Sequence, residues 1–125
     1  MTQIIVVDDD RDNSRLIRML LEMEGYGVHL CPNLASAREA ANANTTAFII
    51  DYYLAQGEIG LDLVTAIRSG DTAAPKETPV IVTSGDERRR EAALEAGANT
   101  FLLKPYGPSV LTGEISSLTG EESSG

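Results

Sequence analysis

The sequence predicts an α/β fold, in which short parallel strands alternate with helices that cover both faces of one sheet. Five short runs rich in β-branched residues alternate with five stretches whose apolar residues recur at helical spacing. The chain has 125 residues, which is the size of one domain with a core of its own. Residues 1–119 are expected to form this domain, and residues 120–125 a disordered tail or the start of a linker.

The predicted strands are runs of four or five mostly apolar residues bounded by polar or turn-forming residues. This pattern is typical of strands that are buried on both faces. The strands are expected at Gln3–Val7, Val28–Cys31, Ala47–Ile50, Val80–Thr83 and Thr100–Leu103. Because a helical stretch lies between each strand and the next, neighbouring strands can run parallel. The sequence therefore predicts five βα units around a parallel sheet.

The first helix is predicted over Asp12–Glu24, and Gly25 can end it. Its apolar residues at helical spacing are Leu16, Met19, Leu20 and Met23. Met19 and Met23, like Cys31 in the second strand, are expected to fill the core. The second helix is predicted over Asn33–Asn42, which is rich in alanine and begins with a residue suited to an N-cap.

The third helix is predicted over Leu61–Ser69, where apolar residues again follow a helical period. The fourth is expected over Glu87–Ala96, with a glycine directly after it as a stop signal. The run Arg88–Arg90 is expected to be the solvated first turn of this helix, although arginines are poorly placed for the helix dipole there, which leaves room for an acidic partner. The fifth helix, Ser109–Leu118, is weaker because it contains a glycine, although Pro108 suits the first helical position.

The charge and composition exclude several classes of protein. Lys and Arg number 10 against 19 Asp and Glu, so the net charge is −9, which argues against a direct nucleic-acid surface. Apolar residues make up 42% of the chain, too many for a disordered acidic segment. One cysteine cannot form an internal disulfide, and no apolar run reaches the roughly 18–20 residues of a membrane helix. We expect a cytoplasmic protein without a signal peptide or a membrane span.

Polar side chains follow four of the five predicted strands. They are Asp8, Asp9 and Asp10 after the first strand, Asp51 after the third, Ser84 after the fourth and Lys104 after the fifth. The carboxyl ends of parallel strands meet at one edge of a sheet, which is where ligands bind. Carboxylates select Mg²⁺ or Mn²⁺, and a carboxylate can also attack phosphorus to form an aspartyl phosphate. A hydroxyl and an ammonium would then bind the phosphoryl oxygens.

Each of these residues also has a simpler interpretation. An aspartate after a strand is often a helix cap, as Asp10 or Asp12 could be, and a serine there is often a turn residue. A lysine before proline is usually a solvated surface residue. Their joint placement at the ends of four strands favours the functional interpretation.

Four motifs resemble those of response-regulator receiver domains of two-component signalling, including the chemotaxis-regulator type. They are IIVVDDD at Ile4–Asp10, FIID at Phe48–Asp51, PVIVTSG at Pro79–Gly85 and GANTFLLKP at Gly97–Pro105. The resemblance implies a (βα)₅ flavodoxin-like three-layer sandwich with strand order 2-1-3-4-5. The segment after Asp51, YYLAQGEIGLDL, resembles receivers of hybrid sensor histidine kinases. A strand directly after Met1 favours a free-standing or N-terminal receiver, so both possibilities stay open.

The resemblance assigns a metal site and a phosphorylation site. Asp51 would be the phosphoacceptor. Mg²⁺, for which Mn²⁺ can substitute, would be bound directly by Asp9, by Asp51 and by the backbone carbonyl of Tyr53, and through a water by Asp8. Tyr53 and Asp86 occupy positions that flank the path of the hydrolytic water in the family, so they would tune dephosphorylation.

The resemblance also assigns the residues of a conformational switch. Ser84 matches the switch hydroxyl, and Lys104 matches the lysine that binds the phosphoryl group. Phe101 matches the aromatic switch position and would rotate toward the interior on phosphorylation. Pro105 would follow a cis peptide bond. Two departures from the family pattern are the absence of a proline shortly after the phosphoacceptor and the position of Gly60, one residue late.

The implied function is to take a phosphoryl group from a phosphohistidine of a sensor histidine kinase or a histidine phosphotransfer protein. The domain would pass the signal of this phosphorelay to a downstream protein through its fourth helix, fifth strand and fifth helix. It would catalyse only its own phosphotransfer and dephosphorylation. The alternative is a haloacid-dehalogenase-like phosphatase that uses Asp8 and Asp10, which would leave Asp51 without a role.

Overall fold

The structure is a computed structural model that describes residues 2–120. Residue 1 and residues 121–125 lie outside the described part, so most of the tail predicted over residues 120–125 is not described. The five parallel strands are β1 (Gln3–Val7), β2 (Gly27–Cys31), β3 (Ala47–Asp51), β4 (Val80–Ser84) and β5 (Thr100–Leu103). Their order in the sheet is β2-β1-β3-β4-β5, as predicted. Strand β1 is therefore central, and Ile4 pairs with Val28 on one side and Ala47 on the other.

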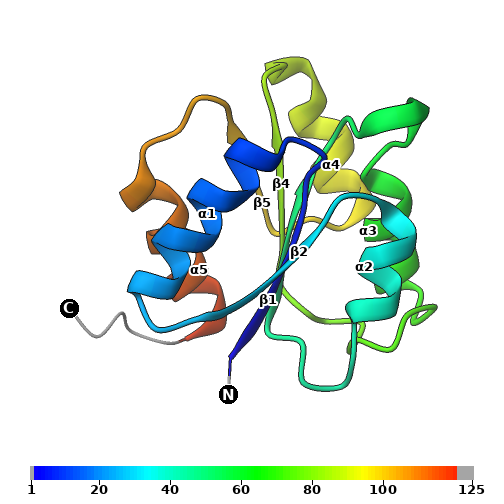
Figure 1. The fold of residues 1–125 in the computed structure, drawn as a ribbon. Coiled ribbons are helices and arrows are strands. Elements are labelled where there is room, and N and C mark those ends of the chain that lie inside the picture. Colours follow the sequence, from blue (N-terminus) through cyan, green and yellow to red (C-terminus); the bar gives the residue numbers. More distant parts are fainter. Residues whose placement is uncertain (1, 121–125) are drawn as a thin grey trace.

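Helices cover both faces of this sheet (Figure 1). Helices α1 (Arg11–Met23) and α5 (Pro108–Thr119) lie on one face. Helices α2 (Leu34–Ala40), α3 (Leu61–Arg68) and α4 (Arg90–Ala96) lie on the other. Two short 3₁₀ turns, η1 (Ala55–Gly57) and η2 (Glu87–Arg89), follow strands β3 and β4. Among residues 2–120, no helix is both long and apolar enough to cross a bilayer.

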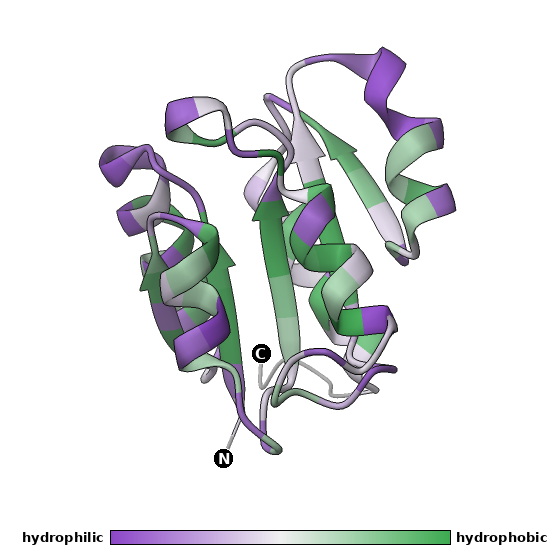
Figure 2. Ribbon diagram, turned by 90° about the vertical axis from the view of Figure 1, so that its right-hand side faces the viewer, coloured by the Kyte–Doolittle hydropathy of each residue, from purple (hydrophilic) through white to green (hydrophobic). Residues whose placement is uncertain are grey.

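The core consists of two apolar layers, one on each face of the sheet. Along β1, Ile5 and Val7 belong to the layer under α2, α3 and α4, whereas Ile4 and Val6 belong to the layer under α1 and α5. This alternation follows from the strand geometry, which turns successive side chains to opposite faces. The strands are mostly apolar and the outer helix surfaces carry polar residues, which Figure 2 shows as largely green strands and purple stretches on the helices.

Helix α1 buries a different face from the one that its apolar spacing predicted. Ser14, Ile17 and Leu21 are its buried residues. Met19 and Met23 are 52% and 77% exposed, so the prediction that they fill the core is wrong. The helix carries two apolar stripes, and periodicity alone does not decide which of them faces the sheet. Cys31 is buried, as predicted.

The ends of the helices follow local rules that the sequence carries. The Asp10 side chain caps α1 by accepting the backbone N–H groups of Asp12 and Asn13. Asn33 caps α2 in the same way, and Pro108 is the first residue of α5. The predicted fourth helix is split, because Glu87–Arg89 form the separate turn η2 before α4 begins.

Candidate functional site

Three carboxylates meet at the carboxyl edge of the sheet. Asp8 and Asp9 follow β1, and Asp51 is the last residue of the neighbouring strand β3. One oxygen from each of the three lies within 4.8 Å of the others. Asp8 is buried, Asp51 is partly buried and Asp9 is exposed, so the cluster opens toward solvent on one side. Such a set of oxygen ligands suits a hard divalent cation.

Hydrogen bonds fix the buried carboxylate of Asp8. Its Oδ1 accepts the backbone N–H of Asp10 at 2.9 Å, and its Oδ2 accepts the Asn13 side-chain amide at 2.6 Å. The Ser14 hydroxyl donates to the Asp8 backbone carbonyl at 3.3 Å. Asp8 is thus held by the first turn of α1, as a buried carboxylate must be held by donors.

A lysine at the end of β5 reaches the carboxylate cluster. The Lys104 Nζ lies 3.2 Å from Oδ2 of Asp51 and 3.7 Å from Oδ2 of Asp8. Its backbone N–H donates to the carbonyl of Ser84 at 2.8 Å, which ties the end of β5 to the end of β4. The Lys104–Pro105 peptide bond is cis. One ammonium therefore faces three carboxylates, and the site keeps an excess of negative charge.

Burial raises the pKa of Asp51 from 3.8 to about 6. The negative charges of Asp8 and Asp9 also raise the pKa of Asp51, whereas the nearby charge and hydrogen bond of Lys104 lower it. An added cation would relieve this repulsion and favour the ionised carboxylate.

Ser84 and Phe101 both lie inside the fold. Ser84 is buried at the end of β4, and its hydroxyl oxygen accepts the backbone N–H of Asp86 at 3.0 Å. The Phe101 side chain is 3% exposed. The Arg90 guanidinium lies 4.9 Å from the centre of the Phe101 ring and donates to the Phe101 carbonyl at 3.2 Å. The structure therefore describes Phe101 in an inward position.

The loop after β3 passes close to the site. The N–H of Gly60 donates to the carbonyl of Tyr52 at 2.7 Å, and Tyr53 pairs with Ile59 in an isolated antiparallel bridge. A Cβ at position 60 would collide with the backbone carbonyl of Asp51. This close approach explains why a glycine stands here although the spacing differs from the family pattern.

The two residues expected to tune dephosphorylation lie beside charged or aromatic partners. Tyr53 is 46% exposed, and its ring packs edge-on against Tyr52 with 4.6 Å between the centres. The carboxylate of Asp86 accepts two side-chain hydrogen bonds of 3.0 Å from Arg88 and lies 3.4 Å from Nε of Arg89. The sequence predicted a solvated arginine run with room for an acidic partner, and the structure pairs Arg88 and Arg89 with the nearby Asp86.

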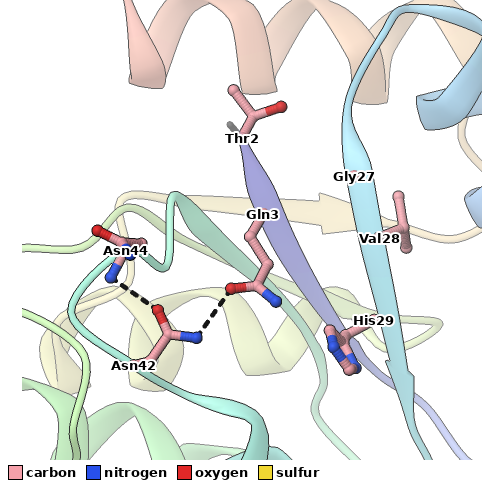
Figure 3. A pocket seen from close by; sticks show the side chains of 7 residues that line it. All are labelled: Thr2, Gln3, Gly27, Val28, His29, Asn42 and Asn44. Carbon is pink, nitrogen blue, oxygen red and sulfur yellow. Dashed lines mark hydrogen bonds between the residues drawn. The ribbon is translucent and has the colours of Figure 1, made fainter.

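A shallow pocket lies at the opposite edge of the sheet (Figure 3). The Asn42 side-chain amide donates to the Gln3 side-chain oxygen at 3.0 Å, and the backbone N–H of Asn44 donates to the Asn42 side-chain oxygen at 2.7 Å. Its lining consists of Thr2, Gln3, Gly27, Val28, His29, Asn42 and Asn44. None of these lining residues is a carboxylate, so the pocket is a poorer candidate for metal or phosphoryl chemistry than the carboxyl edge.

Comparison with known families identifies the family of this chain. The model of the response regulator receiver domain matches residues 4–116. The chain belongs to the response regulator receiver domain family. This receiver domain is 32% identical over 108 residues to the transcriptional regulatory protein SrrA of Staphylococcus aureus. The matched region covers 85% of this chain and 43% of SrrA. It therefore spans less than half the length of that relative.

Solved structures show the same fold. A CheY-like receiver domain protein from Methanospirillum hungatei superposes with a TM-score of 0.84 at 21% identity, covering 96% of this chain and 94% of that one. The receiver domain of NtrX from Brucella abortus gives a TM-score of 0.83 at 25% identity, covering 95% of this chain and 99% of that one. A response regulator from Burkholderia pseudomallei was solved with a phosphorylated aspartic acid and a calcium ion. It gives a TM-score of 0.81 at 20% identity, covering 96% of this chain and 69% of that one.

The family places this receiver domain in two-component signalling, as the sequence motifs predicted. The alternative of a haloacid-dehalogenase-like phosphatase loses its support. It would use Asp10 together with Asp8, whereas Asp10 caps helix α1 and the carboxylates that lie close to Asp8 are those of Asp9 and Asp51.

Proposed function

We propose that the domain accepts a phosphoryl group on Asp51 from a phosphohistidine of a sensor histidine kinase or a histidine phosphotransfer protein. The observation that carries this proposal is the placement of Asp51 beside Asp8, Asp9 and the Lys104 ammonium. An Asp51 oxygen forms a bond to phosphorus as the phosphorus–nitrogen bond breaks, and the leaving imidazole takes up a proton. Apart from this transfer and the later hydrolysis, no other catalysis is proposed.

The carboxylate cluster fits Mg²⁺, with Mn²⁺ as a substitute. Asp9 and Asp51 would bind it directly, together with the backbone carbonyl of Tyr53. The oxygens of Asp8 already accept hydrogen bonds from Asp10 and Asn13, which supports an indirect role through a water. When bound, the cation supplies positive charge that neutralises the phosphoryl oxygens.

Lys104 and Ser84 would bind the phosphoryl group. The Lys104 ammonium already lies 3.2 Å from an Asp51 oxygen, so a small displacement brings it to a phosphoryl oxygen. Ser84 accepts a hydrogen bond from Asp86, which leaves its own proton to donate to a second phosphoryl oxygen. Because Phe101 is buried, we infer that phosphorylation stabilises this inward position rather than creating a new one.

The signal would leave the domain through α4, β5 and α5. This face carries the exposed apolar side chains of Leu94, Leu103 and Val110. This face lies beside the loop after β4. A movement of Ser84 toward the phosphoryl group would displace that loop. We take the receiver domain to span residues 1–119, which the family match over residues 4–116 supports.

Phosphorylation by a small donor tests the proposal without knowledge of the kinase. We expect acetyl phosphate with Mg²⁺ to add the mass of one phosphoryl group to the chain. The Asp51→Asn variant should stay unmodified, and a chelator should abolish the reaction. Asp10→Asn is the matched control, because asparagine also caps helices and Asp10 lies outside the cluster. Labelling that persists in Asp51→Asn, or no labelling of the unchanged chain, would contradict the proposal.

A further inference from the structure

An arginine joins the two loops that flank the Asp51 site. Arg89 is the last residue of the turn η2, which follows β4. Its guanidinium carbon lies 5.7 Å from the centre of the Tyr52 ring and 5.8 Å from that of Tyr53, both in the loop after β3. Its Nε lies 3.4 Å from the Asp86 carboxylate in its own loop. The sequence separation between the two loops makes this a tertiary contact.

The contacts of this arginine differ from those of a solvated side chain. The Arg89 side chain is 35% exposed, whereas Arg88 beside it is 82% exposed. A guanidinium over aromatic rings combines attraction to the π electrons with planar stacking. Tyr52 is anchored by its N–H, which donates to the carbonyl of Thr83 at 2.8 Å. The Tyr53 ring is 46% exposed, and its ring contacts in the structure are those with Tyr52 and Arg89.

We propose that Arg89 is a positioning residue that holds Tyr53 and Asp86 beside the Asp51 site and thereby slows hydrolysis of its acyl phosphate. The inference rests on the proposed phosphorylation of Asp51. In hydrolysis a water oxygen bonds to phosphorus as the bond from phosphorus to the Asp51 oxygen breaks, and the water loses a proton. The products are the Asp51 carboxylate and inorganic phosphate.

Both residues held by Arg89 bear on this water. Asp86 is paired with Arg88 and Arg89, so its carboxylate is a poor acceptor for a proton from the water. Tyr53 follows Asp51 by two residues, and Arg89 lies 5.8 Å from the centre of its ring. With its ring kept there, Tyr53 would hinder the approach of a water to the phosphoryl group. Loss of Arg89 would free the Tyr53 ring and weaken the pairing of Asp86, which keeps its two side-chain hydrogen bonds from Arg88.

The rate of phosphate loss tests this inference. The chain would be phosphorylated with acetyl phosphate, separated from the donor and followed by intact mass. We expect Arg89→Ala to lose phosphate about three- to tenfold faster, the change that loss of one cation–π contact allows. Arg89→Lys should be intermediate, because lysine keeps the charge but not the planar stack. Arg38→Ala is the control, since it breaks an exposed ion pair between Arg38 of α2 and Asp71, which follows α3.

A double-mutant cycle tests whether Arg89 acts through Tyr53. In the Tyr53→Ala background, Arg89→Ala should change the logarithm of the rate less than it does in the unchanged chain. Amide exchange at residues 52–60 gives a readout that needs no phosphate, and it should rise in Arg89→Ala but not in Arg38→Ala. Equal or slower phosphate loss in Arg89→Ala, or additive effects, would overturn this inference alone. Failure of the unchanged chain to become phosphorylated would overturn the proposed function.

Discussion

In its proposed role as phosphoacceptor, Asp51 is under two opposing demands. A nucleophile toward phosphorus must be ionised, whereas burial next to Asp8 and Asp9 favours its protonated form. Lys104 offsets part of this penalty by its charge and hydrogen bond. The pKa of Asp51 nevertheless stays raised to about 6. An added positive charge would therefore favour its ionised form, and the stability of the domain should depend on pH.

The first prediction concerns the pH dependence of stability in the presence of a chelator. The folded pKa of Asp51, about 6, is raised above the unfolded value of 3.8, so the folded state holds its proton more tightly. The stabilising contribution is full below pH 3.8 and is lost as the pH rises through 6. We expect this residue to lower the free energy of unfolding by about 3 kcal/mol over that range.

Urea unfolding at a series of pH values measures this effect. Asp51→Asn removes the titrating group, so its free energy of unfolding should exceed that of the unchanged chain near pH 7.5 and converge with it near pH 4. If the difference between the two proteins did not change with pH, Asp51 would not carry the raised pKa.

Gly60 leads to a second prediction at the scale of a residue. Its φ of −58° is open to any residue, so the constraint is space and not conformation. A Cβ would collide with the Asp51 carbonyl and lie 2.6 Å from a methyl group of Ile50. We expect Gly60→Ala to lower the free energy of unfolding by about 2–3 kcal/mol.

Gly113→Ala is the matched control for Gly60→Ala. Gly113 lies inside α5, and a Cβ there meets nothing within 4 Å. This change should raise the free energy of unfolding by about 0.5–1 kcal/mol, because alanine favours the helix. Chemical denaturation of both variants gives the comparison, and a neutral effect of Gly60→Ala would show that the loop after β3 relaxes easily.

The positions of the site residues could be predicted because they follow from topology. Parallel strands place their carboxyl ends at one edge, so Asp51, Ser84 and Lys104 had to come together once the strands were recognised. The inward position of Phe101 and the Arg89 bridge could not be predicted in this way. They depend on which rotamers pack between loops distant in sequence, and a single sequence carries no signal for such contacts.

At the scale of elements, the strands were predicted more accurately than the helices. Each strand contains a run of mostly apolar residues bounded by polar or turn-forming residues, so its position follows from composition. Helix α1 has two apolar stripes, and the sheet covers the one with Ile17 and Leu21 while Met19 and Met23 stay exposed. The sequence pattern predicts η2 and α4 as one helix, because the Asp86 cap of the separate turn resembles the start of an ordinary helix.

Arg68 connects helix α3 to the loops before β4 and before β5. The guanidinium of this α3 residue donates to the backbone carbonyls of Gly97, Lys76 and Thr78 and to the side chain of Asn99. These acceptors lie before β4 and between α4 and β5, where no helix or strand supplies donors. We expect Arg68→Ala to lower the free energy of unfolding by about 2–4 kcal/mol, because several carbonyls lose a charged donor together.

Arg38→Ala again provides the control. Its ion pair with Asp71 is exposed on both sides, so its loss should change the free energy of unfolding by less than about 1 kcal/mol. Denaturant unfolding distinguishes the two arginines. Equal effects would mean that water replaces the Arg68 donors without penalty.

At the scale of the whole molecule, the chain has a net charge of −9, and three of its carboxylates gather at the carboxyl edge of the sheet. They share that edge with a single ammonium. A polar residue of the site ends or directly follows every strand except β2, and the loops that follow β3 and β4 flank the site. A cation bound at this edge would therefore act on the stability of the sheet and on the loops at once.

The stability of the domain should consequently depend on the Mg²⁺ concentration. A cation that binds the folded but not the unfolded chain raises the free energy of unfolding by about 1.4 kcal/mol for each tenfold increase above its Kd. Asp9→Asn removes one of the three carboxylates and should abolish most of this gain. Asp10→Asn carries the same change in charge one residue away, keeps the cap of α1 and should retain the gain. Thermal unfolding over a Mg²⁺ series, with the ionic strength held constant, separates specific binding from screening. An equal gain in both variants would assign the effect to screening of the acidic surface instead of to the carboxylate cluster.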